Sequence, residues 1–144
     1  MDSLKKAKKK KSKFGINVKS KKKSAVARAT IKNGTGKIKI NNRLVDTINS
    51  KYARDFIKEP LVLAGEDAKN VDIFITVHGS GFMSQAVSAR ACIAKALVEH
   101  TNSEKLKQKF LAYDRLMLVD DPRRVESKKP LGTKARKKKQ KSKR

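Results

Sequence analysis

The sequence predicts an α+β fold, a small mixed sheet with helices packed on one face, flanked by basic extended arms. Segments with the period-two alternation of strands and segments with helical spacing follow one another without the regular βα repeat of an α/β protein. Most of the positive charge lies at the two ends of the chain. We therefore expect three regions: a basic N-terminal arm over residues 1–23, a globular α+β domain over 24–121 and an extended basic tail over 122–144.

The charge distribution separates the arms from the domain. The 144 residues carry a formal net charge of +25, and residues 1–23 hold eleven Lys against one acid. Residues 122–144 hold twelve Lys or Arg, one acid (Glu126) and no aromatic residue, so they cannot bury enough apolar surface to offset the entropy of ordering. A single Lys-rich run is a solvated tail without a partner about as often as it is a binding segment. Two arms around one domain favour a polyanionic partner, and nucleic acid has the matching charge density.

Two strands are expected at the start of the domain. In residues 24–32 the apolar residues Ala25, Ala27, Ala29 and Ile31 alternate with mostly polar ones, which places Arg28 and Lys32 on one face. Residues 33–36, Asn-Gly-Thr-Gly, tolerate positive φ, and the alternation resumes over residues 37–40. The pattern predicts a β-hairpin formed by these two strands.

A first helix is expected over residues 46–58, where apolar residues recur with helical spacing. Asn49 or Ser50 is the candidate N-cap, and Pro60 is expected to end the helix. Residues 61–64 are apolar but are assigned to neither a helix nor a strand.

One strand and two helices make up the rest of the domain. Residues 71–77 place four β-branched residues on one face and Phe74 on the other, which is typical of a core strand. A helix with a narrow stripe of small side chains follows over about residues 84–100. The last helix is expected to begin after Ser103, a good N-cap, and to run to about residue 113.

The segment Gly79-Ser80-Gly81 lies between the core strand and the helix that follows. A dinucleotide fingerprint would need an acid at the end of another strand about 20 residues on, where this chain is still helical, and no P-loop pattern is present. We interpret the turn as one that presents backbone N–H groups and a helix dipole to an RNA phosphate. The glycines also suit a tight strand-to-helix connection, and both interpretations can hold together.

Catalytic and metal-binding residues are not expected, and neither is a cofactor. His78 and His100 have no nucleophile near them in sequence, and Cys92 falls in a helix of small residues as a buried hydrophobe. Asp120-Asp121 precedes a proline and is interpreted as a turn cap rather than a metal site. No apolar run approaches the ~20 residues that span a bilayer, so no membrane partner is expected. A small-molecule substrate is not expected either.

The expected mode of binding is phosphate tracking and shape recognition of folded RNA. Aromatic residues make up 5% of the chain and form no run like the stacking motifs of RNA-recognition sheets, so splayed single strands are not the expected target. Two other classes stay open. One is a compacting protein that coats any nucleic acid, and the other is an enzyme.

Four segments lie in order and at suitable spacing: KKKSAVARATI (21–31), GSGFMSQAVSARACIAKAL (79–97), YDRLMLVDDPRRVESKK (113–129) and QKSKR (140–144). Together they closely resemble the small-subunit ribosomal protein S-nine family (S-sixteen in eukaryotes), over about residues 22–144. Ser80 and Cys92 depart from the family signature, but both are small enough for the turn and the packing to survive. Residues 59–66 and 110–115 are similar to the archaeal and eukaryotic branch.

The resemblance implies a ribosomal S-five domain-two-like fold and a structural role in the head of the small subunit of the cytoplasmic ribosome, on ribosomal RNA and beside neighbouring head proteins. It also implies that the tail reaches the P-site tRNA, which Lys143 and Arg144 would contact. Fully extended, the 23 residues from Pro122 span at most ~75–80 Å. The expected ribosomal-RNA-binding residues are Arg28, Lys32, Gly79, Gly81, Gln85, Arg90, Arg123, Arg124, Lys128, Lys129, Lys134, Arg136 and Lys137.

Overall fold

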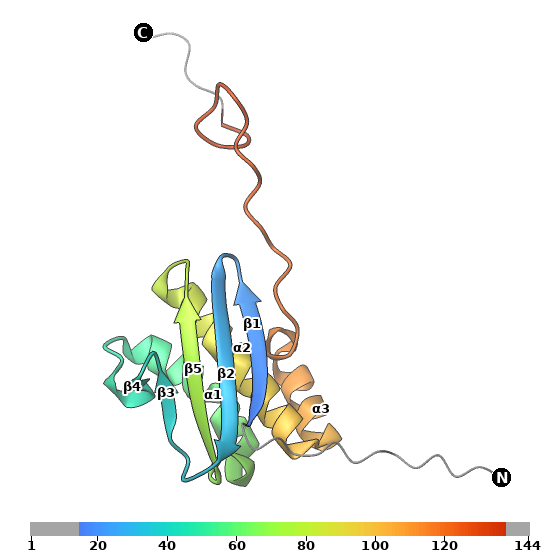
Figure 1. The fold of residues 1–144 in the computed structure, drawn as a ribbon. Helices are drawn as coiled ribbons and strands as arrows, with labels where there is room; N and C mark the ends of the chain where they lie inside the picture. Colours follow the sequence, from blue (N-terminus) through green and yellow to red (C-terminus); the bar gives the residue numbers. More distant parts are fainter. Residues whose placement is uncertain (1–14, 138–144) are drawn as a thin grey trace, which may run out of the picture.

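Figure 1 shows the fold in a computed structural model, which describes residues 15–137. Within these residues the chain forms one five-stranded sheet and three α-helices, and the helices lie behind the sheet in this view. The predicted α+β class, with helices on one face of a mixed sheet, is confirmed. The elements are β1 (Ile16–Lys22), β2 (Ala25–Asn33), β3 (Ile38–Ile40), β4 (Arg43–Leu44), α1 (Lys51–Ala64), β5 (Val71–His78), α2 (Phe82–Thr101) and α3 (Glu104–Tyr113), with short 3-10 turns η1 (Val45–Thr47), η2 (Gly65–Ala68) and η3 (Arg115–Met117).

The order of strands in the sheet is β1-β2-β5-β3-β4, and β3 runs parallel to β5 while the other neighbours are antiparallel. The predicted hairpin between residues 24–32 and 37–40 is therefore wrong, because β5 lies between β2 and β3. The connecting loop crosses the end of β5, where Asp72 Oδ1 accepts hydrogen bonds from the backbone N–H groups of Thr35 and Lys37, both at 2.9 Å. The turn residues in the sequence belong to this crossover.

The first strand lies in the segment that we expected to be an arm. β1 pairs with β2 along its whole length, from Ile16 opposite Ile31 to Lys22 opposite Ala25. Val18 and Ser20 are buried, and Lys19 between them is exposed. Because the helices cover only one face of the sheet, β1 needs only one apolar face, and lysines can occupy the other. The domain thus begins by residue 16 rather than at residue 24, and residues 1–14 of the expected arm lie outside the described residues.

α1 begins at the expected cap but continues past the expected end. Ser50 is the N-cap, and its hydroxyl oxygen accepts a hydrogen bond from the N–H of Ala53 at 3.4 Å. Pro60 lies inside the helix, so the prediction that it ends the helix is wrong. Proline has no N–H for the helical ladder. Pro60 is itself buried, however, and Leu61 and Leu63 after it pack against the core, which offsets the lost bond.

The core lies between the sheet and α2. The four aliphatic β-branched residues of β5 are buried, as predicted, while Phe74 on the opposite face is 42% exposed. The small-residue stripe of α2 is also buried, and Cys92 within this helix is fully buried. Burial raises the pKa of the Cys92 thiol to about 11, so the thiol is neutral in the fold. The buried residues of the α2 stripe are Ala86, Ala89, Ile93, Ala96 and Leu97.

α3 completes the layer of helices. Ser103 is its N-cap, as predicted, and accepts a hydrogen bond from the N–H of Leu106 at 3.4 Å. Leu106 and Phe110 turn into the core, where Phe110 has no exposed surface. Over residues 15–137, none of the helices combines the length and apolarity required to cross a bilayer.

Candidate nucleic-acid interface

The basic tail begins at a buried carboxylate beside the end of β1. Asp121 is 5% exposed and forms an ion pair with Lys22, the last residue of β1. Its carboxylate also accepts hydrogen bonds from the Arg123 guanidinium, the shortest at 2.6 Å. Burial and then the positive charges of Arg123, Lys23 and Arg124 lower the pKa of Lys22. Asp121 therefore counters part of the repulsion within a cluster of four basic residues at the root of the tail.

Asp120 connects the root of the tail to two elements of the domain. Its Oδ1 accepts hydrogen bonds from the Ser20 hydroxyl on β1 at 3.0 Å and from the Lys95 ammonium on α2 at 2.6 Å. Burial acts to raise the pKa of Asp120, but the hydrogen bond and charge of Lys95, with the hydrogen bonds of Ser20 and the Lys21 N–H, outweigh it and lower the pKa. The ionised carboxylate thus fixes where the tail leaves the domain.

The glycine turn connects β5 to α2. Gly79 has a φ of +80°, and a Cβ at this position would collide with the carbonyl oxygen of Ser24, so glycine is required there. Gly81 is the N-cap of α2 with a φ of −94°, and a Cβ would meet open space. The Gln85 amide donates a hydrogen bond to the Gly79 carbonyl oxygen at 3.1 Å. No side-chain hydrogen bond caps the start of α2, and Gly81 and Phe82 at this start are exposed.

The glycine turn and the root of the tail lie at the same end of the sheet. Ser24, which packs against Gly79, follows Lys22 and Lys23 in the β1–β2 turn. Lys22 in turn holds Asp121. Figure 1 shows both turns at the upper end of the sheet and the tail running upward past them. An exposed helix start and a cluster of cations therefore face one region of space, as a phosphate-binding surface requires.

Arg28 and Lys32 lie on the exposed face of β2, as their spacing predicted. In the sheet, Lys19 of β1 is opposite Arg28, and Asp72 of β5 is opposite Lys32. Hydrogen bonds from the backbone N–H groups of Lys37 and Thr35 lower the pKa of Asp72. Asp72 therefore stays ionised, and its one negative charge offsets part of the positive charge of this face.

Arg90 is not on the surface, which corrects its assignment as an RNA contact. Its side chain is 6% exposed and forms ion pairs with Glu59 of α1 at 2.7 Å and with Asp114 at 2.6 Å. Its guanidinium also lies over the rings of Phe56 and Tyr113, 4.4 and 5.9 Å from their centroids. Arg90 joins the three helices behind the sheet, and its charge is used within the domain.

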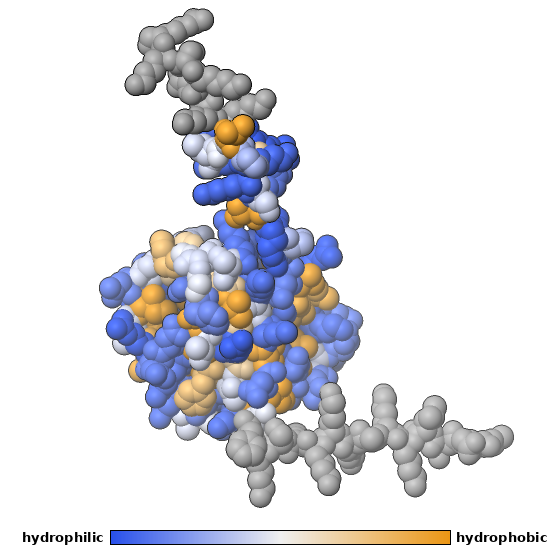
Figure 2. All heavy atoms as spheres, turned by 45° about the horizontal axis from the view of Figure 1, so that its top comes forward, coloured by the Kyte–Doolittle hydropathy of each residue, from blue (hydrophilic) through white to orange (hydrophobic). Residues whose placement is uncertain are grey.

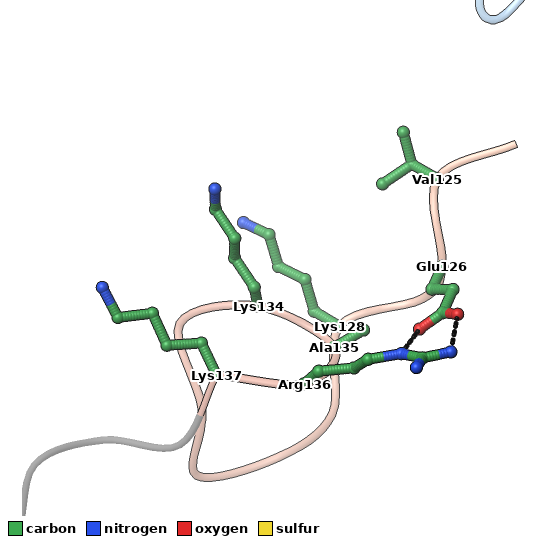
Figure 3. A pocket seen from close by; sticks show the side chains of 7 residues that line it. All are labelled: Val125, Glu126, Lys128, Lys134, Ala135, Arg136 and Lys137. Atoms are coloured by element: carbon green, nitrogen blue, oxygen red, sulfur yellow. Dashed lines mark hydrogen bonds and ion pairs between the residues drawn. The ribbon is translucent and has the colours of Figure 1, made fainter.

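The described part of the tail folds back on itself, as Figure 3 shows. Arg136 donates two hydrogen bonds to the Glu126 carboxylate, at 3.0 and 2.6 Å, and so closes a loop. The hydrogen bond from Arg136 lowers the pKa of Glu126. The side chains of Lys128, Lys134 and Lys137 extend to one side of the loop, away from this pair (Figure 3). The loop therefore presents three ammonium groups together.

The tail residues expected to bind RNA are all exposed, in contrast to Arg90. Figure 2 shows a largely hydrophilic surface on the tail and on much of the visible face of the domain, with apolar patches between. Lys143 and Arg144, expected at the tip, lie outside the described residues. The exposed residues of the tail set are Arg123, Arg124, Lys128, Lys129, Lys134, Arg136 and Lys137.

Sequence reasoning missed the basic residues of β1. Lys19 and Lys21 are exposed on the same face as Arg28, and Lys22 anchors Asp121. The signal was present, because Ile16, Val18 and Ser20 alternate with polar residues. The high lysine content of the first 23 residues hid this short alternation.

These features define a basic α+β protein of the RNA-binding class. The profile of the family described as ribosomal protein S9/S16 matches residues 20–144. Curated relatives include the small ribosomal subunit protein uS9 from two strains of Methanococcus maripaludis, C7 and S2, each 44% identical over 115 residues, which cover 80% of this chain and 86% of the relative. The chain belongs to the ribosomal protein S9/S16 family.

Proposed function

We propose that this chain is a structural, non-enzymatic constituent of the small ribosomal subunit, that it binds ribosomal RNA of the subunit head, and that its tail reaches the P-site tRNA. The observation that carries the proposal is the family match, which begins in β1 and continues through the basic tail to residue 144. Neighbouring proteins of the head are the expected protein partners, and the cytoplasmic ribosome is the expected location.

The geometry supports three RNA-binding surfaces on one protein. The first is the end of the sheet, with Gly79, Gly81 and Gln85 at the start of α2 and Arg123 and Arg124 at the root of the tail. The second is the basic face of β2. The third is the tail itself, where Lys128, Lys129, Lys134, Arg136 and Lys137 are exposed. Arg90 is left out of the proposed set because it is buried and paired.

The fixed root and the long tail suit two separate tasks. Asp120 and Asp121 hold the root on the domain, so residues beyond it extend from a defined point. Phosphate contacts along the path would neutralise the charge of the tail and release counterions. Lys143 and Arg144 at its end would then bind the tRNA backbone.

Density-gradient sedimentation of a lysate of the cell that makes this protein tests the proposal. We expect the chain to sediment with small subunits, and to leave that position after ribonuclease treatment. Sedimentation at the top of the gradient, or with bulk DNA, would contradict the proposal and favour a compacting protein that binds without choosing a site.

A further inference from the structure

The face of the sheet that points away from the helices is open and basic. Over residues 15–137, no helix packs on this face, since all three lie behind the sheet (Figure 1). Asp72 is the single acid in the five described strands, and it is engaged by the N–H groups of Thr35 and Lys37. The basic residues whose positions alternate onto this face are Lys19 and Lys21 of β1, Arg28 and Lys32 of β2, and Lys39 of β3.

Phe74 lies at the centre of this open face. It is 42% exposed, whereas the other apolar residues of β5 point to the opposite face and are buried in the core. In the sheet it is opposite Thr30 on one side and Lys39 on the other. Arg28 and Lys32, two residues either side of Thr30, are its diagonal neighbours, which in a sheet are about 7–8 Å away. Three basic residues thus occupy positions next to this aromatic residue in the sheet.

This arrangement fits an unpaired stretch of RNA better than a duplex. The face of an aromatic ring stacks on the face of a base, which a nucleotide offers only when it is outside a helix. Cations on one strand recur about every 6.6–6.8 Å and neighbouring strands lie about 4.8 Å apart, so a flexible backbone can place successive phosphates near them. A duplex would meet the same cations but would leave the ring without a base to stack on.

We infer that the open face binds an unpaired segment of RNA, with one base stacked on Phe74 and the adjoining phosphates held by Arg28, Lys32 and Lys39. The inference rests on the proposed function for the RNA partner, and it adds a site separate from the tail. It also revises the expectation that aromatic content excludes single strands. That expectation considered runs of aromatic residues along the sequence, whereas the sheet gathers the cations around one ring.

The first experiment measures binding of the full chain to a fluorescent 12-nucleotide oligouridylate across a series of salt concentrations. We expect Phe74→Ala to weaken binding about tenfold, because each stacked base contributes about 1–3 kcal/mol. The salt slope should not change, since no phosphate contact is lost. Lys39→Gln should instead reduce the slope by about 0.7, the value for one phosphate on a single strand. Unchanged affinity for Phe74→Ala would overturn the inference.

The matched control is Tyr52→Ala. Tyr52 is an exposed aromatic residue, at 67%, but it belongs to α1 behind the sheet, where it stacks on Phe56. We expect its removal to leave oligouridylate binding unchanged. An equal loss of affinity for Tyr52→Ala and Phe74→Ala would overturn the inference, because it would show that exposed aromatic residues contribute without regard to their place.

The second experiment locates the contact in the assembled particle. Purified small subunits that contain this chain are irradiated at a wavelength that joins bases to aromatic side chains, and the cross-linked peptides are identified by mass spectrometry. We expect a nucleotide on Phe74, and its loss in Phe74→Leu, which keeps the apolar character of the position. Cross-links confined to the tail and the glycine turn, or a protein cross-link at Phe74, would overturn the inference and leave the proposed function standing. Absence of the chain from small subunits is the separate outcome that contradicts the proposed function.

Discussion

The hydroxyl of Ser20 donates a hydrogen bond to Asp120 at 3.0 Å, across 100 positions of sequence. The same oxygen of Asp120 receives the ammonium of Lys95 at 2.6 Å. One carboxylate therefore joins the first strand, the central helix and the root of the tail. The direction in which the tail leaves is set by β1, within a segment whose composition alone indicated an unstructured arm.

Removal of the neighbouring carboxylate, that of Asp121, should cause a large loss of stability. Asp121→Ala leaves Lys22, whose side chain is 12% exposed, without its ionic partner. Removal of one member of a buried pair costs about 3–5 kcal/mol, and we expect about 3 kcal/mol because part of the ammonium is in contact with solvent. Urea denaturation followed by circular dichroism measures the loss. Asp67→Ala, at an exposed position in η2, is the control and should change the free energy of unfolding by less than about 0.5 kcal/mol.

Acid should weaken the attachment of the tail through Asp120. Its pKa in the fold is lowered from 3.8, so the carboxylate stabilises the fold fully above about pH 4, and this contribution is lost as the pH falls through the lower folded pKa. We expect the difference in free energy of unfolding between the natural chain and Asp120→Asn to be constant above about pH 4 and to shrink below it. Urea titrations at a series of pH values measure it. A difference that grows with acidity would contradict the assignment.

Two glycines of one turn should respond differently to the same change. Gly79→Ala introduces a Cβ that collides with the Ser24 carbonyl oxygen at a positive φ, and the left-handed conformation alone costs a non-glycine residue about 1–2 kcal/mol. We expect a loss of at least about 2 kcal/mol. Gly81→Ala meets open space and should cost less than about 1 kcal/mol. Thermal denaturation of both variants tests this, and equal losses would contradict the geometry of the turn.

Arg90→Lys should destabilise the domain without a direct effect on RNA. Lysine cannot reproduce the planar fork that contacts Glu59 and Asp114 together, and it loses the stacking over Phe56. We expect a loss of about 2–4 kcal/mol in urea denaturation. RNA affinity, measured where both proteins are fully folded, should not change. Weaker RNA binding with unchanged stability would restore Arg90 to the RNA-binding set.

The tip of the tail should affect tRNA rather than assembly. Deletion of Lys143 and Arg144 removes two cations and leaves Lys128, Lys134 and Arg136 along the path. We expect small subunits to form at normal abundance but to retain P-site tRNA less well, measured by filter binding of labelled tRNA to purified subunits. Failure of the subunits to assemble would show instead that the tip has a structural role.

Local signals predicted much of this fold. The caps Ser50 and Ser103 were identifiable because a hydroxyl before a helical pattern satisfies the N–H groups of the first turn. The buried face of β5 was identifiable because a strand covered on one side alternates with period two. In both cases the feature is explained by residues only a few positions apart in the sequence.

Other features depend on contacts between distant residues. The Asn-Gly-Thr-Gly segment suits a hairpin, yet Asp72, far along the chain, accepts its N–H groups and makes it a crossover. A proline usually ends a helix, but Pro60 lies inside α1, where it is buried. Arg90 has the sequence character of an RNA contact, and only the positions of Glu59 and Asp114 show that its charge is neutralised inside the domain.

The place of β5 in the sheet has a consequence for synthesis of the chain. β2 and β3 are made first, but each pairs with β5, which follows them by more than thirty residues. Until residues 71–78 have emerged, both strands have an unpaired edge with free N–H and C=O groups, and such edges invite pairing with other chains. The like charges of the lysines on β1 to β3 oppose such pairing between unfinished copies of this protein.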